Sequence, residues 1–148
     1  MSFIYLASPY THQDSEVRKQ RQQDAEIAAS FFMRDGDVVY SPIAHNCAID
    51  KHLPKNVSND HNFWMKQRYA MLDKSKAMKV LLLNDVEQSK GVRLEIIRAT
   101  EIGIHVSFWN KIISSEGIKF IFANQEKTFE KMGFQKLSLW KPIQHWSA

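Results

Sequence analysis

The stretch VLLLNDVEQSKGVRLEIIRATEIGIHVSFW, residues 80–109, predicts a strand, a helix and a second strand in succession. Val80–Leu83 is apolar at every position, as in a central strand of a parallel sheet. The helix extends from a capping serine, Ser89, to a terminating glycine, Gly103, and Ile104–Trp109 forms the next strand. Two parallel strands joined by a helix are the repeating unit of α/β folds, so this stretch sets the fold class.

One carboxylate falls on the apolar face of this helix. Val92, Ile96 and Ala99 recur at helical spacing, and Glu95 lies within the stripe that they form. A glutamate at such a position either extends to solvent or pairs with Arg98, or it is held there for a chemical purpose. Glu95 is therefore the first candidate functional residue.

Strands and helices alternate along the rest of the chain. The other predicted strands are Phe3–Ala7, Val38–Pro42 and Ile118–Phe122. The other predicted helices cover residues 14–34 and 63–76, and residues 43–60 are expected to form a long loop around a short helix. This order predicts one α/β domain over residues 1–148, with a three-layer, Rossmann-like or flavodoxin-like parallel sheet of about five strands and helices on both faces. Ligands of such folds bind beyond the carboxyl ends of the strands, where Glu95 also lies.

Composition restricts the class of protein. The chain has 148 residues, of which 44% are hydrophobic and 24% charged, as in a soluble globular protein. No apolar run approaches the roughly 20 residues of a membrane span, and the single cysteine, Cys47, fits a reducing cytoplasm. The net charge of +4 is spread along the chain, without a basic block. We therefore expect a cytoplasmic protein that binds neither membranes nor nucleic-acid polymers.

Four motifs together resemble a known family. They are IYLASPYTH at residues 4–12, VVYSPIAH at 38–45, the FW…LD segment at 63–73 and SKGVRLEI at 89–96. From about residue 3 to 107 the chain is similar to bacterial and phage proteins of unassigned function related to nucleoside 2-deoxyribosyltransferases and 2′-deoxynucleoside 5′-phosphate N-hydrolases. The most specific parts are YLASPY and the Ser-x-Gly-x-x-x-Glu spacing of the fourth motif.

The resemblance implies catalytic roles for two residues. Glu95 would be the nucleophile that attacks the anomeric carbon of a deoxyribose and expels the base. Tyr5 would position this carboxylate through its hydroxyl, and its hydrogen bond would counteract the rise in pKa that burial causes. The reaction needs no metal and no organic cofactor, and the histidines of the chain lack the spacing of metal ligands.

The resemblance also implies a phosphorylated substrate. The transferases that act on free nucleosides commonly carry an acidic residue at the position of Ser89, whereas the nucleotide N-hydrolases carry serine. A serine at a helix N-terminus offers a phosphate its hydroxyl and free N–H groups, and Gly91 lets the backbone approach, although a plain helix cap explains the same residues. Ser8 is expected to cradle sugar and phosphate, Tyr10 to close over the ligand, and His45 to contact base or phosphate unless it is structural.

One position departs from the family pattern. The family usually has an aspartate on the helix before the third strand, where it reaches the leaving base or the sugar, and alignment places Arg68 there. Either Asp73 takes this role in a different register, or the aspartate is absent and Arg68 adds a cation to the pocket. The second case favours a more phosphorylated ligand, or a protein that binds it with little catalysis.

These features predict cleavage of the N-glycosidic bond of a 2′-deoxynucleoside 5′-monophosphate, by a hydrolase or a base-exchanging transferase. The alternatives are a nucleotide-binding or sequestering protein on the same fold, and a structural relative that binds a partner. In the resembling enzymes a neighbouring subunit closes the active site, so at least a homodimer is expected. Aromatic residues that complete the core or form an oligomer contact are Trp109, Phe120, Phe122, Phe129, Phe134, Trp140 and Trp146.

Overall fold

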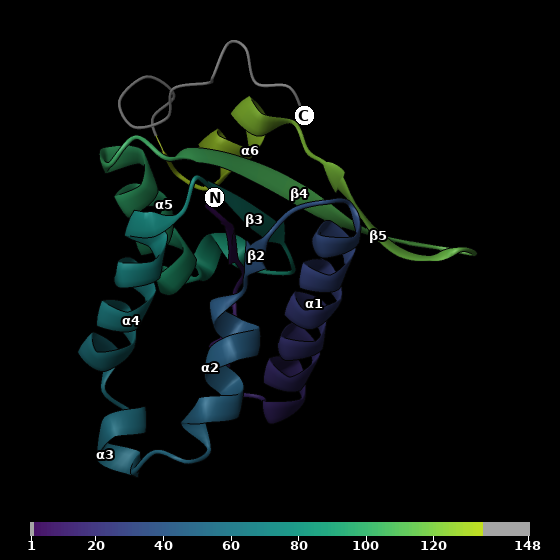
Figure 1. Ribbon diagram of the computed structural model, residues 1–148. Coiled ribbons are helices and arrows are strands. Elements are labelled where there is room, and N and C mark those ends of the chain that lie inside the picture. Colours follow the sequence, from purple (N-terminus) through teal and green to yellow (C-terminus); the bar gives the residue numbers. More distant parts are fainter. Residues whose placement is uncertain (1, 135–148) are drawn as a thin grey trace.

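A five-stranded sheet forms the centre of the protein in the computed structural model, which describes residues 2–134 (Figure 1). The strands are β1 Ile4–Ala7, β2 Val39–Tyr40, β3 Ala77–Leu82, β4 His105–Ser114 and β5 Gly117–Phe122. Their order is β2-β1-β3-β4-β5, and the first four run parallel. The predicted α/β fold with about five strands is confirmed.

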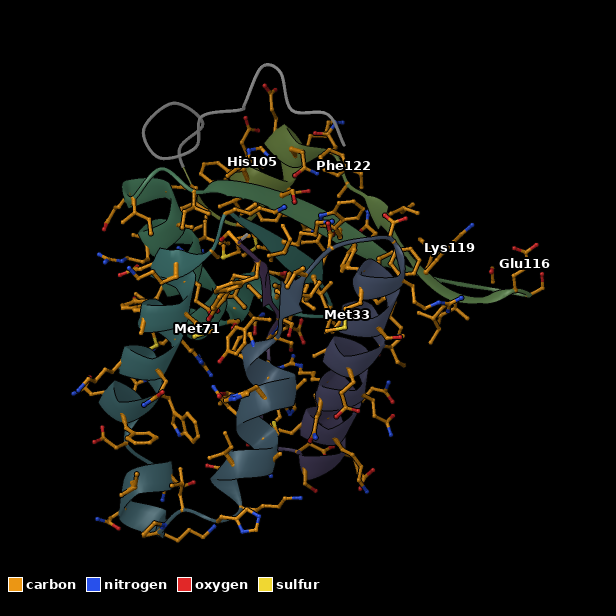
Figure 2. All side chains as sticks on the ribbon, viewed as in Figure 1. Met33, Met71, His105, Glu116, Lys119 and Phe122 are labelled. Atoms are coloured by element: carbon orange, nitrogen blue, oxygen red, sulfur yellow. The ribbon has the colours of Figure 1, made fainter. Side chains whose placement is uncertain are left out.

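β5 is the one strand that does not follow the predicted parallel arrangement, since it pairs with β4 in antiparallel orientation. Only residues 115 and 116 separate the two strands, and a connection that short permits a hairpin but no crossover helix. The hairpin extends beyond the rest of the sheet (Figure 1). Figure 2 shows Glu116 and Lys119 pointing outward from it, and both are exposed.

The helices cover both faces of the sheet. They are α1 Ser15–Arg34, α2 Pro42–Asp50, α3 Lys55–Ser58, α4 His61–Lys74, the 3-10 helix η1 Val86–Gln88, α5 Lys90–Glu101 and α6 Gln125–Lys131. Pro42 was expected to close a strand but begins α2, because Ser41 caps this helix and proline fits its first turn. Within residues 2–134, no helix combines the length and the apolar composition needed to cross a membrane.

Each face of the sheet has its own apolar core. On one face, Leu6 of β1 and Leu81 of β3 pack with Phe32 of α1. On the other face, Tyr5 of β1 belongs to a cluster that includes Ile96 of α5 and residues of α4 and α6. Successive side chains of a strand point to opposite faces, so Tyr5 points toward α4 and α5 while Leu6 points toward α1.

The aromatic residues expected in the core or at an oligomer contact fall into three groups. Buried in the two cores are Phe120, Phe129 and Phe134. Trp109 packs against Phe32 with ring centroids 5.0 Å apart, and Phe122 is 42% exposed. Trp140 and Trp146 lie outside the described residues. The homodimer stays a prediction.

A buried arginine joins the loops that follow β1 and β3. Arg21 of α1 is 7% exposed. Its Nη1 donates a hydrogen bond to the backbone oxygen of Thr11 at 2.9 Å, and its Nη2 donates one to that of Asn84 at 3.0 Å. The guanidinium therefore fixes the carboxyl ends of two neighbouring strands relative to each other, at the edge of the sheet where ligands bind in such folds.

Replacing this arginine is expected to destabilise the protein. Arg21→Met removes two charge-assisted hydrogen bonds and should lower the free energy of unfolding by about 2–4 kcal/mol. Lys19→Met, an exposed position on the same helix, should change it by less than about 0.5 kcal/mol. Urea denaturation of both variants measures the difference, and equal effects would show that Arg21 joins the loops without stabilising them.

Candidate active site

A buried carboxylate and a buried phenol meet between α5 and β1. Glu95 is 2% exposed and Tyr5 is fully buried, and the Tyr5 hydroxyl donates a hydrogen bond to Glu95 Oε2. Glu95 therefore neither extends to solvent nor pairs with Arg98, which binds Asp73 instead. The apolar stripe of α5 holds the carboxylate against the sheet, and β1 supplies its hydrogen-bond donor.

The environment of this pair shifts both pKa values. Burial raises the pKa of the Glu95 carboxyl above its ordinary value, because the ionised form loses its water. The charge of Arg68 and the hydrogen bond from Tyr5 act in the opposite direction and lower it. Burial, followed by the charge of Glu95, raises the pKa of the Tyr5 hydroxyl well above its ordinary value. Tyr5 therefore retains its proton as a hydrogen-bond donor, and the Glu95 carboxyl is poorly hydrated.

A cavity of 410 Å³ opens onto Glu95. This volume lies within the range of about 300–1,000 Å³ that is typical of small-molecule sites. The residues predicted to bind substrate that line it are Ser8, Tyr10, Arg68, Ser89 and Gly91. They come from the loop after β1, from α4 and from the start of α5, so the structure brings them together with the carboxylate around one space.

The N-terminus of α5 forms one wall of the cavity. Ser89 caps the helix by accepting a hydrogen bond from the backbone N–H of Val92 at 3.3 Å. Lys90 begins the helix and also lines the cavity. Ser8 also lines this cavity, and its Oγ is buried and has no hydrogen-bond partner among the described residues. A helix N-terminus, a lysine and an unpaired hydroxyl are together suited to an anion.

Arg68 places a cation beside the carboxylate. A Cβ at Gly91 would lie 3.0 Å from Arg68 Nη1, so glycine at this position makes room for the guanidinium against α5. The Nε atom of Arg68 is buried and has no hydrogen-bond partner within residues 2–134. Arg68, on α4, is thus the cation that interacts with Glu95. The family that the sequence resembles usually has an aspartate at this position.

Two predicted site residues lie outside the cavity. Asp73 binds Arg98 with both carboxylate oxygens at 2.9 and 2.8 Å, and this hydrogen bonding holds the pKa of Asp73 below its usual range. It follows Arg68 by five residues, which turns it about 140° around the helix and away from Glu95. His45 Nδ1 contacts Asn46 Oδ1 at 2.9 Å, and its ring packs on Tyr40. Neither residue belongs to the candidate site.

Several further residues line the cavity that the sequence did not predict as site residues, among them His61, Trp64 and Lys90. His61, Trp64 and Arg68 follow one another at intervals of three and four residues, which places them on one face of α4. That spacing is visible in the sequence and identifies the face of α4 that meets the cavity. Among residues 2–134, no group of three or more His, Cys, Asp or Glu side chains is arranged to hold a metal ion.

A family model described as a domain of unknown function, DUF1937, matches residues 2–111. The chain belongs to this family. The matched segment contains every predicted site residue. No curated protein matches the chain significantly.

Among solved structures, the fold is similar to that of a 2-deoxyribosyltransferase from the psychrotolerant bacterium Bacillus psychrosaccharolyticus. The TM-score is 0.52 at 17% sequence identity, over 72% of this chain and 71% of that one. That protein is described as a biocatalyst for the synthesis of nucleosides. The predicted relation to nucleoside 2-deoxyribosyltransferases is confirmed at the level of the fold.

Glu95 is expected to reduce stability at neutral pH. Because its pKa is raised in the folded state, the protein loses stability as the pH rises from about 4.5, the ordinary pKa of glutamate, through the raised value. Glu95→Gln should therefore raise the free energy of unfolding at pH 8, by about 1.4 kcal/mol for each unit by which the pKa is raised. The gain should shrink at pH 4, where the carboxyl is largely protonated in both states.

Urea denaturation at the two pH values measures this effect. Glu101→Gln, an exposed position at the end of the same helix, is the matched control and should show no comparable gain at pH 8. A Glu95→Gln variant that is less stable than wild type at pH 8 would mean that Tyr5 and Arg68 fully offset the cost of burying the carboxylate.

Proposed function

We propose that the protein cleaves the N-glycosidic bond of a 2′-deoxynucleoside 5′-monophosphate, with Glu95 as the nucleophile. The observation that carries this proposal is a buried carboxylate, hydrogen-bonded by Tyr5, at the wall of a 410 Å³ cavity. Burying a carboxylate opposes folding, and such groups concentrate at functional sites. The fold it shares with a 2-deoxyribosyltransferase supports glycosyl chemistry at this position.

The proposed reaction has two steps. A carboxylate oxygen of Glu95 attacks C1′ of the sugar, and the bond from C1′ to the base breaks. Water then opens the glycosyl ester, which yields 2-deoxyribose 5-phosphate and restores the carboxylate. Tyr5 orients Glu95, and Tyr5 and Arg68 both lower the pKa of the carboxyl against the effect of its burial. A base that replaces water in the second step would make the protein a transferase, and Ser89 favours the hydrolase.

The start of α5 supports a phosphate on the substrate. The free N–H groups of the helix, the Lys90 ammonium and the unpaired Ser8 hydroxyl line the same cavity as Glu95. A free nucleoside has no charged group that would use these donors, whereas a 5′-phosphate uses all of them. The substrate class is therefore proposed as nucleoside monophosphates.

A second candidate function is nucleotide binding without turnover, and Arg68 favours it. A fixed cation beside Glu95 opposes the positive charge that develops on the sugar in an oxocarbenium-like transition state. The same cation strengthens the binding of an anionic nucleotide in the ground state. Such a protein would sequester or sense nucleotides.

Release of free base separates the two functions. The wild-type protein is incubated with each deoxynucleoside and ribonucleoside monophosphate, and free base is measured by chromatography. Glu95→Ala should lower the rate by about 10⁴-fold or more, because it removes the nucleophile. Tyr5→Phe should lower it less and move the acidic limb of the pH profile to higher pH, since the pKa of Glu95 then rises.

Two outcomes contradict the enzymatic proposal. Tight nucleotide binding with no base released by the wild-type protein would favour the second candidate function. Base release that persists at the wild-type rate in Glu95→Ala would exclude this carboxylate as the nucleophile.

The phosphate position is tested at Ser89 in the Glu95→Gln background, where binding is measured by calorimetry without turnover. Ser89→Asp retains a helix-capping residue and adds a negative charge. It should weaken monophosphate binding at least tenfold, because two unit charges 4 Å apart repel by about 4 kcal/mol near a surface. Ser89→Asn, a neutral cap of similar shape, is the control. Equal losses for monophosphates and free nucleosides would refute a phosphate at this site.

A further inference from the structure

The cavity at Glu95 adjoins a second cavity along α2. The second cavity has a volume of 270 Å³ and shares Tyr10, Trp64 and Arg68 with the first. It extends to Asn46 on α2, which the first cavity does not reach. We call the cavity that contains Glu95 the inner compartment and the one that contains Asn46 the outer compartment. Arg68 belongs to the wall that they share.

Two buried donors without partners belong to residues that line this space. Arg68 Nε and Asn46 Nδ2 have no hydrogen-bond partner among the described residues, and Asn46 is only 8% exposed. The amide oxygen of Asn46 is already in contact with His45 Nδ1 at 2.9 Å. A guanidinium and an amide nitrogen donate hydrogen bonds and accept none. Because buried polar groups are nearly always paired, these two donors are suited to a ligand that supplies acceptors in the outer compartment once the side chains turn toward it.

The position of Arg68 identifies which part of a substrate supplies them. If C1′ of the sugar lies at Glu95 and the phosphate at the start of α5, the group that remains for the outer compartment is the base. Arg68 then lies beside the bond that breaks. We propose that the outer compartment holds the base and that Arg68 selects pyrimidines, whose 2-oxo group is adjacent to the glycosidic nitrogen. This inference rests on the proposed function.

The chemistry of arginine favours a pyrimidine over a purine. Arginine does not release its proton at neutral pH, so it cannot protonate N7 of a purine, which is how purines leave most readily. It does stabilise negative charge through charge-assisted hydrogen bonds. A departing pyrimidine carries its negative charge on N1 and on the 2-oxo oxygen, and this oxygen is the acceptor that we assign to Arg68.

The proposed step balances as follows. A Glu95 oxygen forms a bond with C1′ while the bond from C1′ to N1 breaks, and the electron pair of that bond passes to the pyrimidine. The 2-oxo oxygen of the resulting anion accepts hydrogen bonds from Arg68. The oxygen of a water molecule then bonds to C1′ and displaces Glu95, and the proton released by that water neutralises the pyrimidine anion.

Arg68→Lys tests the inference because it keeps the positive charge near Glu95 but removes Nε as a donor. The ratio of kcat/KM for 2′-deoxyuridine 5′-monophosphate to that for 2′-deoxyadenosine 5′-monophosphate should exceed one in the wild type. In Arg68→Lys this ratio should fall by about 10- to 100-fold. A 5-fluoro substituent, which makes the pyrimidine a better leaving group, should accelerate Arg68→Lys more than the wild type.

A binding measurement tests Asn46 separately in the Glu95→Gln background. Asn46→Ala should weaken the binding of 2′-deoxyuridine 5′-monophosphate about tenfold more than the binding of 2-deoxyribose 5-phosphate, which lacks a base. Thermal melting checks that each variant is folded. Equal losses for both ligands would overturn the placement of the base in the outer compartment.

The outcomes distinguish this inference from the proposed function. Glu95-dependent release of purines as fast as pyrimidines would overturn the selection by Arg68 and leave the proposed function standing. Pyrimidine-selective binding without release of any base would support the base position and overturn the proposed catalysis. Equal binding of purine and pyrimidine monophosphates without release would overturn both.

Discussion

The hydrogen bond from the Tyr5 phenol to the Glu95 carboxylate is the interaction on which the candidate site depends. It joins the central part of the sheet to the helix that follows β3, through two side chains that are almost completely buried. The Tyr5 hydroxyl donates a hydrogen bond to Glu95 and does not easily ionise, since its own pKa is raised. The carboxylate therefore has a fixed orientation and little water, two properties that favour nucleophilic attack over surface solvation.

Arg68 is the second partner of the carboxylate and gives the site its individual character. Burial raises the pKa of the Glu95 carboxyl, and the charge of the guanidinium acts in the opposite direction. The same side chain belongs to the wall between the two compartments. Arg68 thus acts both on the ionisation of Glu95, the proposed nucleophile, and on the binding of the group in the neighbouring compartment. An aspartate at this position would not lower the pKa of Glu95.

The sequence sufficed for the features that depend on local pattern. The strand, helix and strand of residues 80–109 are present, Ser89 caps α5, and Gly103 ends it with a positive φ of 79°. Helical spacing placed Glu95 on the apolar face of α5, although spacing alone left open whether its carboxylate extends to solvent. Other features depend on geometry that a pattern does not contain. The direction of β5 was set by a two-residue turn. Whether Arg68 or Asp73 lines the cavity depends on which face of α4 meets it. The unpaired donors of the outer compartment become visible only when residues of α2 and α4 are seen to line the same cavity.

The close approach of Arg68 to Gly91 has a consequence for substitution at either position. A Cβ at position 91 would lie 3.0 Å from Nη1, so the guanidinium would have to shift to admit it. The two positions, 23 residues apart in the sequence, are therefore sterically coupled. A larger residue at 91 requires a shorter or redirected side chain at 68, and an arginine held in its present place requires a glycine beside it.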